Sequence, residues 1–278
     1  MNELFVMSLR AKHRSEGTIR EYAKAIDNCL DYVNKPEAEI KPIDLELWQS
    51  SISNLSSASV AQRTSAVREY FKFLYRNEFI NRNPAEMLEA PAIKNREQSA
   101  LNGEQVRAMV NAATNLRNKA IIMMLAQTGL RIHEFANITL EQYESRNNNV
   151  LVIRGKGDKD RLVGLADETI ELIDSYVVNE RKGGCEYLFV GNRGNKMDGK
   201  NTSAMLKVCA RKAGIENWEE LHISNHTMRR TFATMMSEAD VPIEVISKAM
   251  GHSGIQITSR YVKRTEQRAV NAMSVVNF

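Results

Sequence analysis

Six residues beyond position 130 have side chains suited to phosphoryl transfer without a metal ion. A phosphodiester transition state spreads negative charge over its oxygens, and arginine forks bind such oxygens through paired, charge-assisted hydrogen bonds. Stabilising that charge is usually the largest catalytic contribution. The set combines two arginines, a lysine, two histidines and a tyrosine: Arg131, Lys156, His226, Arg229, His252 and Tyr261.

The tyrosine would be the nucleophile of this set. A tyrosine hydroxyl has a pKa of about 10, so at neutral pH it needs a proton acceptor or nearby positive charge before it can attack. A lysine can give a proton to the departing sugar oxygen. Each residue taken singly has a more ordinary explanation as a packing or surface group. The prediction therefore depends on the combination.

The spacing of these residues agrees with the chemistry. His226 and Arg229 lie three residues apart, which places them on one face of a helix. His252 precedes Tyr261 by nine residues, enough for a turn and the start of another helix. The sequence has no carboxylate cluster typical of a two-metal nuclease and no GxxxxGK[ST] phosphate-binding loop. We therefore expect neither a metal nor another cofactor.

The first ninety residues have helical periodicity throughout. Thr18 followed by Glu21 has the pattern of a helix-capping box. An apolar face follows at helical spacing, which predicts a buried helix side. That face comprises Ile19, Tyr22, Ile26, Leu30 and Val33.

A second strong helix is predicted over roughly residues 59–76. Its basic residues lie mostly off the apolar stripe and could form either a solvated face or a phosphate-facing surface. The basic residues are Arg63, Arg68, Lys72 and Arg76, and the stripe is Val60, Thr64, Val67, Phe71 and Leu74.

The chain is predicted to form two domains, 1–90 and 102–278, joined by a linker at 91–101, where periodicity is lost. Asn102 can cap the next helix, with Gln105 three residues on. The buried-looking helix 120–126 should end at Gly129. Two β-prone runs, 150–154 and 161–165, flank a Gly-rich basic tip and predict a hairpin. The expected fold is mainly α with a small β-sheet: a helical N-terminal domain and a mixed α/β C-terminal domain.

Bulk composition limits the class of protein without choosing one. The net charge is +4, and the first 95 residues are charge-balanced, so the basic excess lies in the C-terminal part. That excess favours a polyanionic partner only weakly. No apolar run reaches the ~20 residues of a membrane span, and no signal-peptide pattern is present. Cys29, Cys185 and Cys209 are scattered and suggest neither zinc nor disulfides. We expect a cytoplasmic protein.

Four motifs together resemble the tyrosine recombinase (phage integrase) family. TGLRIHE resembles the box with the first arginine, and RGKGDKDR resembles the hairpin with the lysine. HTMRR resembles the His-x-x-Arg box, and MGHSGIQITSRY resembles the box that ends in the nucleophile. Their order and spacing match over about residues 100–265. The helical N-terminal domain resembles the family's core-binding, DNA-binding domain.

The resemblance implies a role for each motif residue. Tyr261 would attack the phosphate, form a 3′-phosphotyrosine and leave a free 5′-hydroxyl. Arg131 and Arg229 would hold the non-bridging oxygens, and Lys156 would protonate the leaving 5′ oxygen. The bond energy is kept in the phosphotyrosine, so neither ATP nor a metal is required.

The remaining motif residues would assist. His226 would help proton transfer at Tyr261, His252 would donate a hydrogen bond to the phosphate, and Glu134 would support the site from behind. His133 stands where the family commonly has a small residue, and we interpret it as a packing or helix-surface group. DNA contacts are expected from Arg63, Arg68, Lys72, Arg76, Lys159 and Arg230.

The resemblance also implies partners. Double-stranded DNA core sites, a tetramer on DNA and accessory DNA-bending proteins are expected, in a cytoplasmic, nucleoid-associated protein with no membrane partner. Because the helical pattern begins near residue 15, we expect no separate arm-binding domain, as in small Xer-type or mobile-element integrases. In the tail 268–278, Val270, Met273 and Val276 form an apolar stripe that would pack on the chain's own core or dock on a neighbouring protomer.

Two other functions are compatible with the sequence. A type IB topoisomerase shares the tyrosine chemistry but relaxes supercoils without a specific site. A non-catalytic DNA-binding regulator could use the same fold, although the complete set of six reactive residues argues against it. Integration, excision, inversion and dimer resolution are not distinguished by the sequence.

Overall fold

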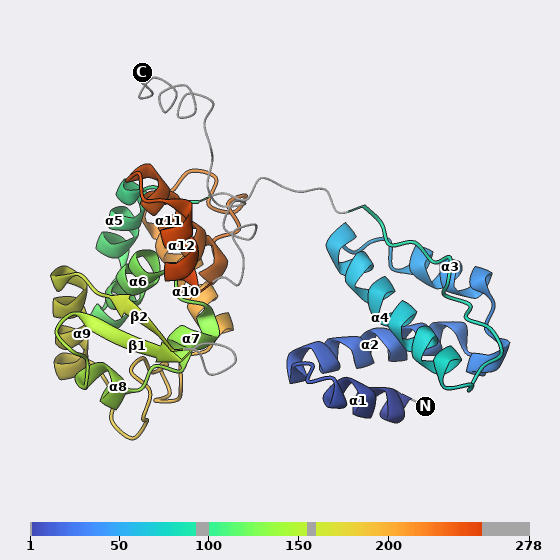
Figure 1. Cartoon of the computed structure of the whole chain (residues 1–278). Helices are drawn as coiled ribbons and strands as arrows, with labels where there is room; N and C mark the ends of the chain where they lie inside the picture. The colour runs from blue at the N-terminus through green and yellow to red at the C-terminus, as the bar shows by residue number, and fades with distance from the viewer. Residues whose placement is uncertain (1, 93–99, 155–159, 252–278) are drawn as a thin grey trace, which may run out of the picture. The chain divides into compact units, whose positions relative to one another are not determined.

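The computed structural model describes residues 2–92, 100–154 and 160–251. The chain divides into two compact units, residues 1–96 and 97–278, each drawn in Figure 1 with its helices labelled. The fold is mainly helical with a small two-stranded sheet, as predicted. Within the described ranges, no helix is long and apolar enough to cross a membrane.

Unit 1 is a helical bundle around an aromatic and aliphatic core. The stripe predicted for the second strong helix is confirmed, since all five of its residues are buried. Trp48 is buried, and its indole Nε1 donates to Oδ1 of Asn28 at 3.1 Å, so its polar atom is satisfied. The helices are α1 (Asn2–Ala11), α2 (Glu16–Val33), a 3₁₀ turn (Glu37–Glu39), α3 (Pro42–Ser51) and α4 (Ser57–Arg76).

The predicted start of α2 at Thr18 is wrong. Ser15 is the N-cap, and its Oγ accepts a hydrogen bond from the Thr18 backbone N–H at 3.2 Å. Both residues are capping types, but starting at Ser15 adds backbone hydrogen bonds such as that from Ile19 N to Ser15 O. The apolar face of α2 is confirmed: Ile19 and Ile26 are buried, and the other three residues pack against the same core.

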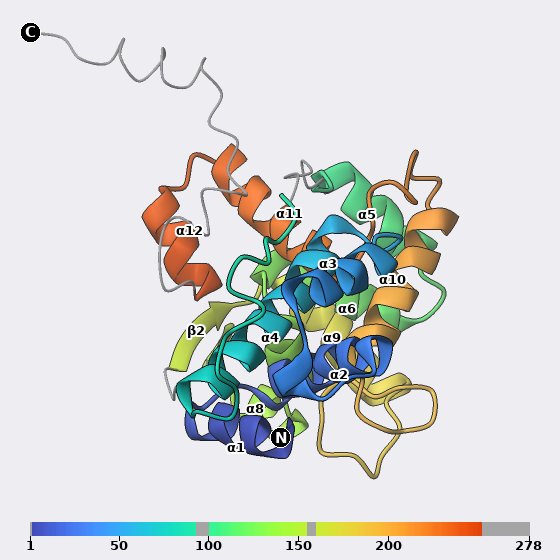
Figure 2. The ribbon, with the colours of Figure 1, turned by 90° about the vertical axis from the view of Figure 1, so that its right-hand side faces the viewer.

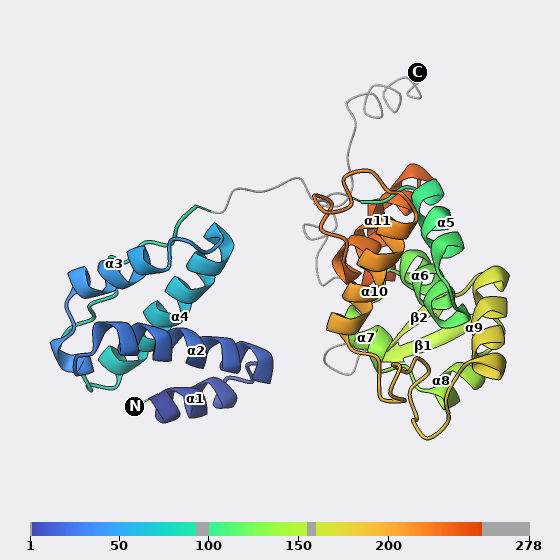
Figure 3. The same cartoon turned by 180° about the vertical axis from the view of Figure 1, so that it is seen from behind.

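Unit 2 is built around α6, whose apolar residues are almost all buried. Helices α5, α9 and α11 pack directly on it, and Figure 3 shows this arrangement from behind. The predicted ends of two helices are confirmed: Asn102 caps α5 with Gln105, and Gly129 caps α6 at φ +57°. The helices are α5 (Gly103–Ala112), α6 (Leu116–Thr128), α7 (Ile132–Ala136), α8 (Leu140–Glu144), α9 (Asp167–Asn179), α10 (Gly199–Lys212), α11 (Asn225–Glu238) and α12 (Ile243–Met250).

The predicted hairpin is the only sheet among the described residues. Strands β1 (Val150–Arg154) and β2 (Asp160–Gly164) pair antiparallel, with Val150 opposite Gly164 and Arg154 opposite Asp160. Strand β2 begins and ends one residue earlier than predicted. Helix α12 lies against β2, as the view in Figure 2 also shows. The hairpin thereby joins the part of unit 2 that carries the reactive motifs.

Candidate active site

Arg131 lies in the sharp connection between α6 and α7, where the backbone places it as the N-cap of α7. Its own N–H is held by Oε2 of Glu134, three residues on, at 2.7 Å. This is the reciprocal half of a capping box. The position of Arg131 is therefore set by a local backbone motif as well as by its side chain.

Glu134 is the centre of a buried charge cluster. Its side chain is 1% exposed and accepts hydrogen bonds from two arginine side chains. Arg131 Nη1 reaches Oε1 at 3.1 Å, while Arg161 of β2 reaches both oxygens, at 2.7 and 3.0 Å. A carboxylate between two guanidinium groups leaves the trio with one net positive charge, which suits a phosphate site.

The pKa of Glu134 shows which influence prevails in this cluster. Burial acts to raise the pKa of the carboxyl group, but the hydrogen bonds from Arg161 and the Arg131 N–H, with the charges of both arginines, lower it below its ordinary value. Glu134 is therefore a carboxylate at neutral pH and keeps both arginines oriented.

Arg229 is buried on the first turns of α11 and reaches the same region. Its Nη1 donates to the carbonyl oxygen of Gly129, and its Nη2 donates to that of Met250 at 2.6 Å. Arg131 Nη2 donates to Gly251 O at 2.9 Å, and its Nη1 lies 3.5 Å from Met250 O. The two motif arginines, 98 positions apart in sequence, therefore meet at the carboxyl end of α12.

Two glycines permit this approach. Gly129 and Gly251 have φ of +57° and +63°, a region that residues with a Cβ rarely adopt. A Cβ on Gly251 would lie 3.1 Å from Arg161 Nη1 and 3.5 Å from Arg131 Nη1. Gly251 thus lets the chain pass directly over both guanidinium groups just before His252.

His226 is an exposed residue in the first turn of α11, three residues before Arg229. Partial desolvation by the surrounding protein, with the positive charges of Arg230 and Arg229, lowers its pKa. The imidazole is therefore neutral at pH 7 and able to accept a proton. Arg230 is partly exposed, and His133 is an exposed residue of α7.

Four of the predicted site residues lie outside the described residues: Lys156, Lys159, His252 and Tyr261. The tail stripe of Val270, Met273 and Val276 also lies outside them. Their roles stay predictions. The structure describes the residues that adjoin them in sequence, namely the ends of β1 and β2 and the turn at Gly251.

Two other tyrosines of unit 2 are poor nucleophiles. Tyr143 and Tyr176 are each 1% exposed. Burial raises the pKa of both hydroxyls, and in Tyr143 the hydrogen bond to Asp174 raises it further. Neither hydroxyl can reach a phosphate in a DNA backbone without local unfolding.

A metal centre or a reactive thiol would be an alternative site in the described part of the chain, where Cys185 is free and partly exposed. There, no group of three or more His, Cys, Asp or Glu side chains is placed to hold a metal ion. Cys29 is buried, and its burial raises the pKa of the thiol to about 12. Cys209 is also buried, with a raised pKa.

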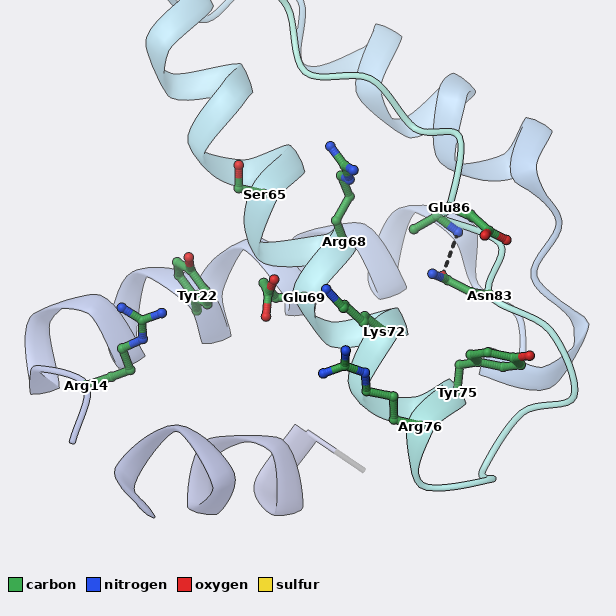
Figure 4. Close-up of a pocket in the computed structure, with 11 residues that line it drawn as sticks. Arg14, Tyr22, Ser65, Arg68, Glu69, Lys72, Tyr75, Arg76, Asn83 and Glu86 are labelled. Atoms are coloured by element: carbon green, nitrogen blue, oxygen red, sulfur yellow. Dashed lines mark hydrogen bonds between the residues drawn. The ribbon is translucent and has the colours of Figure 1, made fainter. Parts of the chain in front are cut away.

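Unit 1 carries a separate basic hollow along α4. Four cations outnumber two carboxylates among the residues that line it (Figure 4). The cations are Arg14, Arg68, Lys72 and Arg76, the carboxylates are those of Glu69 and Glu86, and Tyr22 and Tyr75 also line the hollow. The four cations are exposed and form no ion pair with any described residue. Arg63 belongs to a different hollow, with Glu21, Lys24 and Gln62. The structure thus brings together three of the four basic residues predicted on this helix.

Comparison with known proteins identifies the family. The chain matches the phage integrase family over residues 99–268 and the phage integrase N-terminal SAM-like domain over residues 3–78. The chain belongs to the phage integrase family. The resemblance inferred from the four motifs is confirmed.

Relatives of this chain match it along nearly its whole length. Tyrosine recombinase XerA of Pyrococcus horikoshii is 30% identical, covering 98% of this chain and 91% of the relative. Tyrosine recombinase XerD of Yersinia pestis is 29% identical, covering 92% and 90%. The crystal structure of XerA recombinase superposes with a TM-score of 0.56 at 25% identity, covering 100% and 98%. A lambda integrase(75-356) dimer bound to a COC′ core site has a TM-score of 0.77 at 14% identity, covering 95% of each chain, and shows the shared fold.

Proposed function

We propose that this protein is a site-specific tyrosine recombinase that cleaves and rejoins DNA strands through a 3′-phosphotyrosine. The observation that carries the proposal is the meeting of Arg131 and Arg229 at the end of α12. There, Arg131 donates to the carbonyl group directly before His252. Membership of the phage integrase family, with Xer recombinases as relatives, supports the same activity.

The proposed reaction begins when the Tyr261 oxygen attacks phosphorus. The new bond joins that oxygen to phosphorus, and the bond from phosphorus to the 5′ oxygen breaks. Arg131 and Arg229 hold the charge on the non-bridging oxygens, with a hydrogen bond from His252. His226, neutral at pH 7, takes the tyrosine proton. Religation reverses these steps on a new 5′-hydroxyl, so the phosphodiester energy is conserved.

Lys156 is the proposed general acid. Expelling an alkoxide is costly because alcohols are about as weakly acidic as water, whose pKa is about 15.7. A proton delivered during bond breaking increases the rate roughly 10²–10⁴-fold.

Bridging sulfur tests this assignment. A thiol, with a pKa of about 8.5, leaves without a proton. Lys156→Ala should cleave a 5′-oxygen substrate very slowly and a 5′-sulfur substrate almost as fast as wild type. An equal defect on both would make the lysine an electrostatic group only.

We further propose that both units bind double-stranded DNA core sites. Arg68, Lys72 and Arg76 would contact backbone phosphates from unit 1, the proposed core-binding domain. Arg63 would do so from its separate hollow, and Lys159 and Arg230 from unit 2, the proposed catalytic domain. The likeness to recombinases solved on DNA supports this. We propose that residues 91–101 are the linker between the core-binding domain and the catalytic domain.

Assembly and location follow from the same proposal. Two core sites must be brought together before strands can be exchanged, so we propose a tetramer on DNA, aided by accessory DNA-bending proteins where the site requires them. The tail 268–278 would couple protomers, and its deletion should leave single-site binding intact but weaken synapsis. A DNA substrate would place the protein in the cytoplasm at the nucleoid.

One assay separates recombination from the alternatives. A duplex nicked beside the cleavage point traps the covalent intermediate, because the short fragment with the free 5′-hydroxyl diffuses away and cannot be rejoined. A recombinase should form the adduct on its own site and exchange strands between two sites. A topoisomerase would relax supercoils without a site, and a regulator would bind without any adduct. Adduct formation should continue in EDTA.

A further inference from the structure

Arg161 is the one side chain that joins the hairpin to the Arg131 cluster through an ion pair among the described residues. It lies on β2 five positions after Lys156, its side chain is 12% exposed, and it grips both oxygens of Glu134. Its Nε atom is buried without a hydrogen-bond partner in the described part of the chain. All the hydrogen bonds that its guanidinium makes there are therefore directed at one carboxylate.

The fork geometry determines how Glu134 is oriented. A two-pronged contact fixes the plane of the carboxylate, whereas a single hydrogen bond would leave it free to turn. In that fixed plane, Oε2 also accepts from the Arg131 N–H and Oε1 accepts from Arg131 Nη1. Rotation of the carboxylate would weaken both contacts to Arg131.

We propose that Arg161 is a positioning residue that sets the orientation of Arg131 through Glu134. The inference rests on the proposed function, because Arg131 matters only if it holds a phosphate. Arg161 itself needs no contact with DNA. Through Arg161, the orientation of the phosphate-binding Arg131 depends on strand β2. The ion pair therefore fixes the position of Arg131 relative to the hairpin that carries the proposed general acid.

A rival explanation is that Arg161 serves only Lys156. Both lie in the hairpin region, so loss of Arg161 could disturb the delivery of the lysine rather than Arg131. A third explanation is that the ion pair supports folding alone. The three explanations predict different responses to changes in the scissile phosphate.

The first measurement compares cleavage rate with DNA affinity. Arg161→Ala should cleave a nicked substrate about 10²-fold more slowly at saturating protein, the usual effect of misplacing a catalytic group by about 1 Å, while its affinity for the site stays near wild type. Arg161→Lys keeps the charge but replaces the fork with one nitrogen, so it should lose less stability than Arg161→Ala and show an intermediate rate. Wild-type rates in both variants would overturn the proposal.

Arg146 provides the matched control. It is a partly buried arginine of the same unit, 19% exposed, whose Nη2 pairs with Asp174 at 3.5 Å. Arg146→Ala and Arg146→Lys remove a weaker, more exposed ion pair away from the Arg131 cluster, since the side chain of Asp174 is 51% exposed. Both should cleave at the wild-type rate. An equal slowing in the Arg146 variants would assign the Arg161 effect to general loss of structure and overturn the proposal.

The second measurement uses three versions of the scissile phosphate. They are the natural diester, a methylphosphonate in which a methyl group replaces one charged non-bridging oxygen, and the 5′-sulfur diester. Removing the charge reduces the need for Arg131, whereas sulfur removes the need for Lys156. We expect the rate profile of Arg161→Ala over the three substrates to match that of Arg131→Ala. A match to Lys156→Ala, or to neither, overturns the proposal.

Failure of the proposed function looks different from failure of this inference. If wild type forms no adduct with any site-bearing duplex, or Tyr261→Phe forms one, the recombinase chemistry itself is wrong. If those controls behave as proposed and only the Arg161 profiles disagree, the recombinase stands and the positioning role falls.

Discussion

The basic hollow of unit 1 and the arginine cluster of unit 2 use positive charge in opposite ways. Arg68, Lys72 and Arg76 are exposed and make no ion pairs with described residues. In unit 2, Glu134 is almost completely buried and holds two arginines. Exposed charges attract polyanions at little desolvation cost but do not fix their orientation. Buried, paired charges have a large desolvation cost but are held in one geometry.

The difference suggests a division of labour. Long, solvated side chains can follow a DNA backbone of any sequence and should contribute affinity that falls with salt. Arginines fixed by a buried carboxylate cost no reorganisation when a phosphate enters, which is the property that stabilises a transition state. We therefore expect substitutions in the hollow of unit 1 to alter DNA affinity, and substitutions around Glu134 to alter the rate of DNA cleavage.

Salt should produce the largest effect. If the protein makes roughly 6–10 phosphate contacts, its affinity for the site should fall by about 10³–10⁵ between about 50 and 200 mM salt. Replacing Arg68, Lys72 and Arg76 by alanine should lower the slope of log affinity against log salt by about three, one per contact. Fluorescence anisotropy at several salt concentrations measures both.

Arg10→Ala is the control for that series. Arg10 is exposed on unit 1, but its guanidinium is paired with Glu16. It should leave the salt slope close to wild type. A flat response of the wild type, or an unchanged slope in the triple variant, would remove phosphate binding from the hollow of unit 1.

Glu134→Ala should produce the next largest effect. It leaves two arginines without their shared carboxylate in a buried place, so the free energy of unfolding should fall by about 3–5 kcal/mol. Cleavage should fall with it. Urea denaturation measures the first and adduct formation the second. Glu141→Ala, which removes an exposed glutamate from α8, should change neither.

Gly251→Ala should have a moderate effect that separates rate from affinity. The left-handed backbone would cost about 1–2 kcal/mol, and the new methyl group would press on Arg161. Adduct formation should slow while DNA affinity is retained. Gly164→Ala, on the same strand as Arg161 but with open space around its Cβ position, should behave as wild type. Equal rates in the two variants would contradict tight packing at this turn.

His226 should give the smallest effect, a pH dependence of stability. The pKa of His226 is lowered in the folded protein, whereas in the unfolded chain it has the ordinary histidine value of about 6.5. The unfolded chain therefore binds a proton at this residue more readily as the pH falls toward that value. Stability should therefore decrease as pH falls from about 7 through that window. Thermal melts should show a smaller decrease for His226→Gln. An identical pH profile would mean that neither the partial desolvation nor the neighbouring cations lower the pKa of this imidazole.

Much of the fold follows from local sequence patterns. The stripe of α4, the cap at Asn102, the end of α6 at Gly129 and the hairpin were all predicted, because each depends on spacing within a few residues. The start of α2 is not fixed by local pattern, because Ser15 and Thr18 are both good caps and only packing and backbone hydrogen bonds decide between them.

The support of the site was less predictable. Glu134 could be paired with Arg131 because they are three residues apart, but Arg161 is 27 positions from Glu134. The sequence signal was present, since an arginine follows the Gly-rich tip of the hairpin, yet nothing local shows which carboxylate it meets. The separation of Arg63 from Arg68, Lys72 and Arg76 likewise depends on where each side chain leaves the helix.

Locating the DNA link on the protein tests the proposed chemistry most directly. Wild-type protein would be trapped on a nicked duplex carrying its site, in EDTA, then digested and examined by mass spectrometry. We predict a phosphate-linked nucleotide on the peptide that contains Tyr261, and no adduct from Tyr261→Phe at equal DNA occupancy. A link to Tyr143 or Tyr176, or a strict need for a divalent metal, would contradict the mechanism.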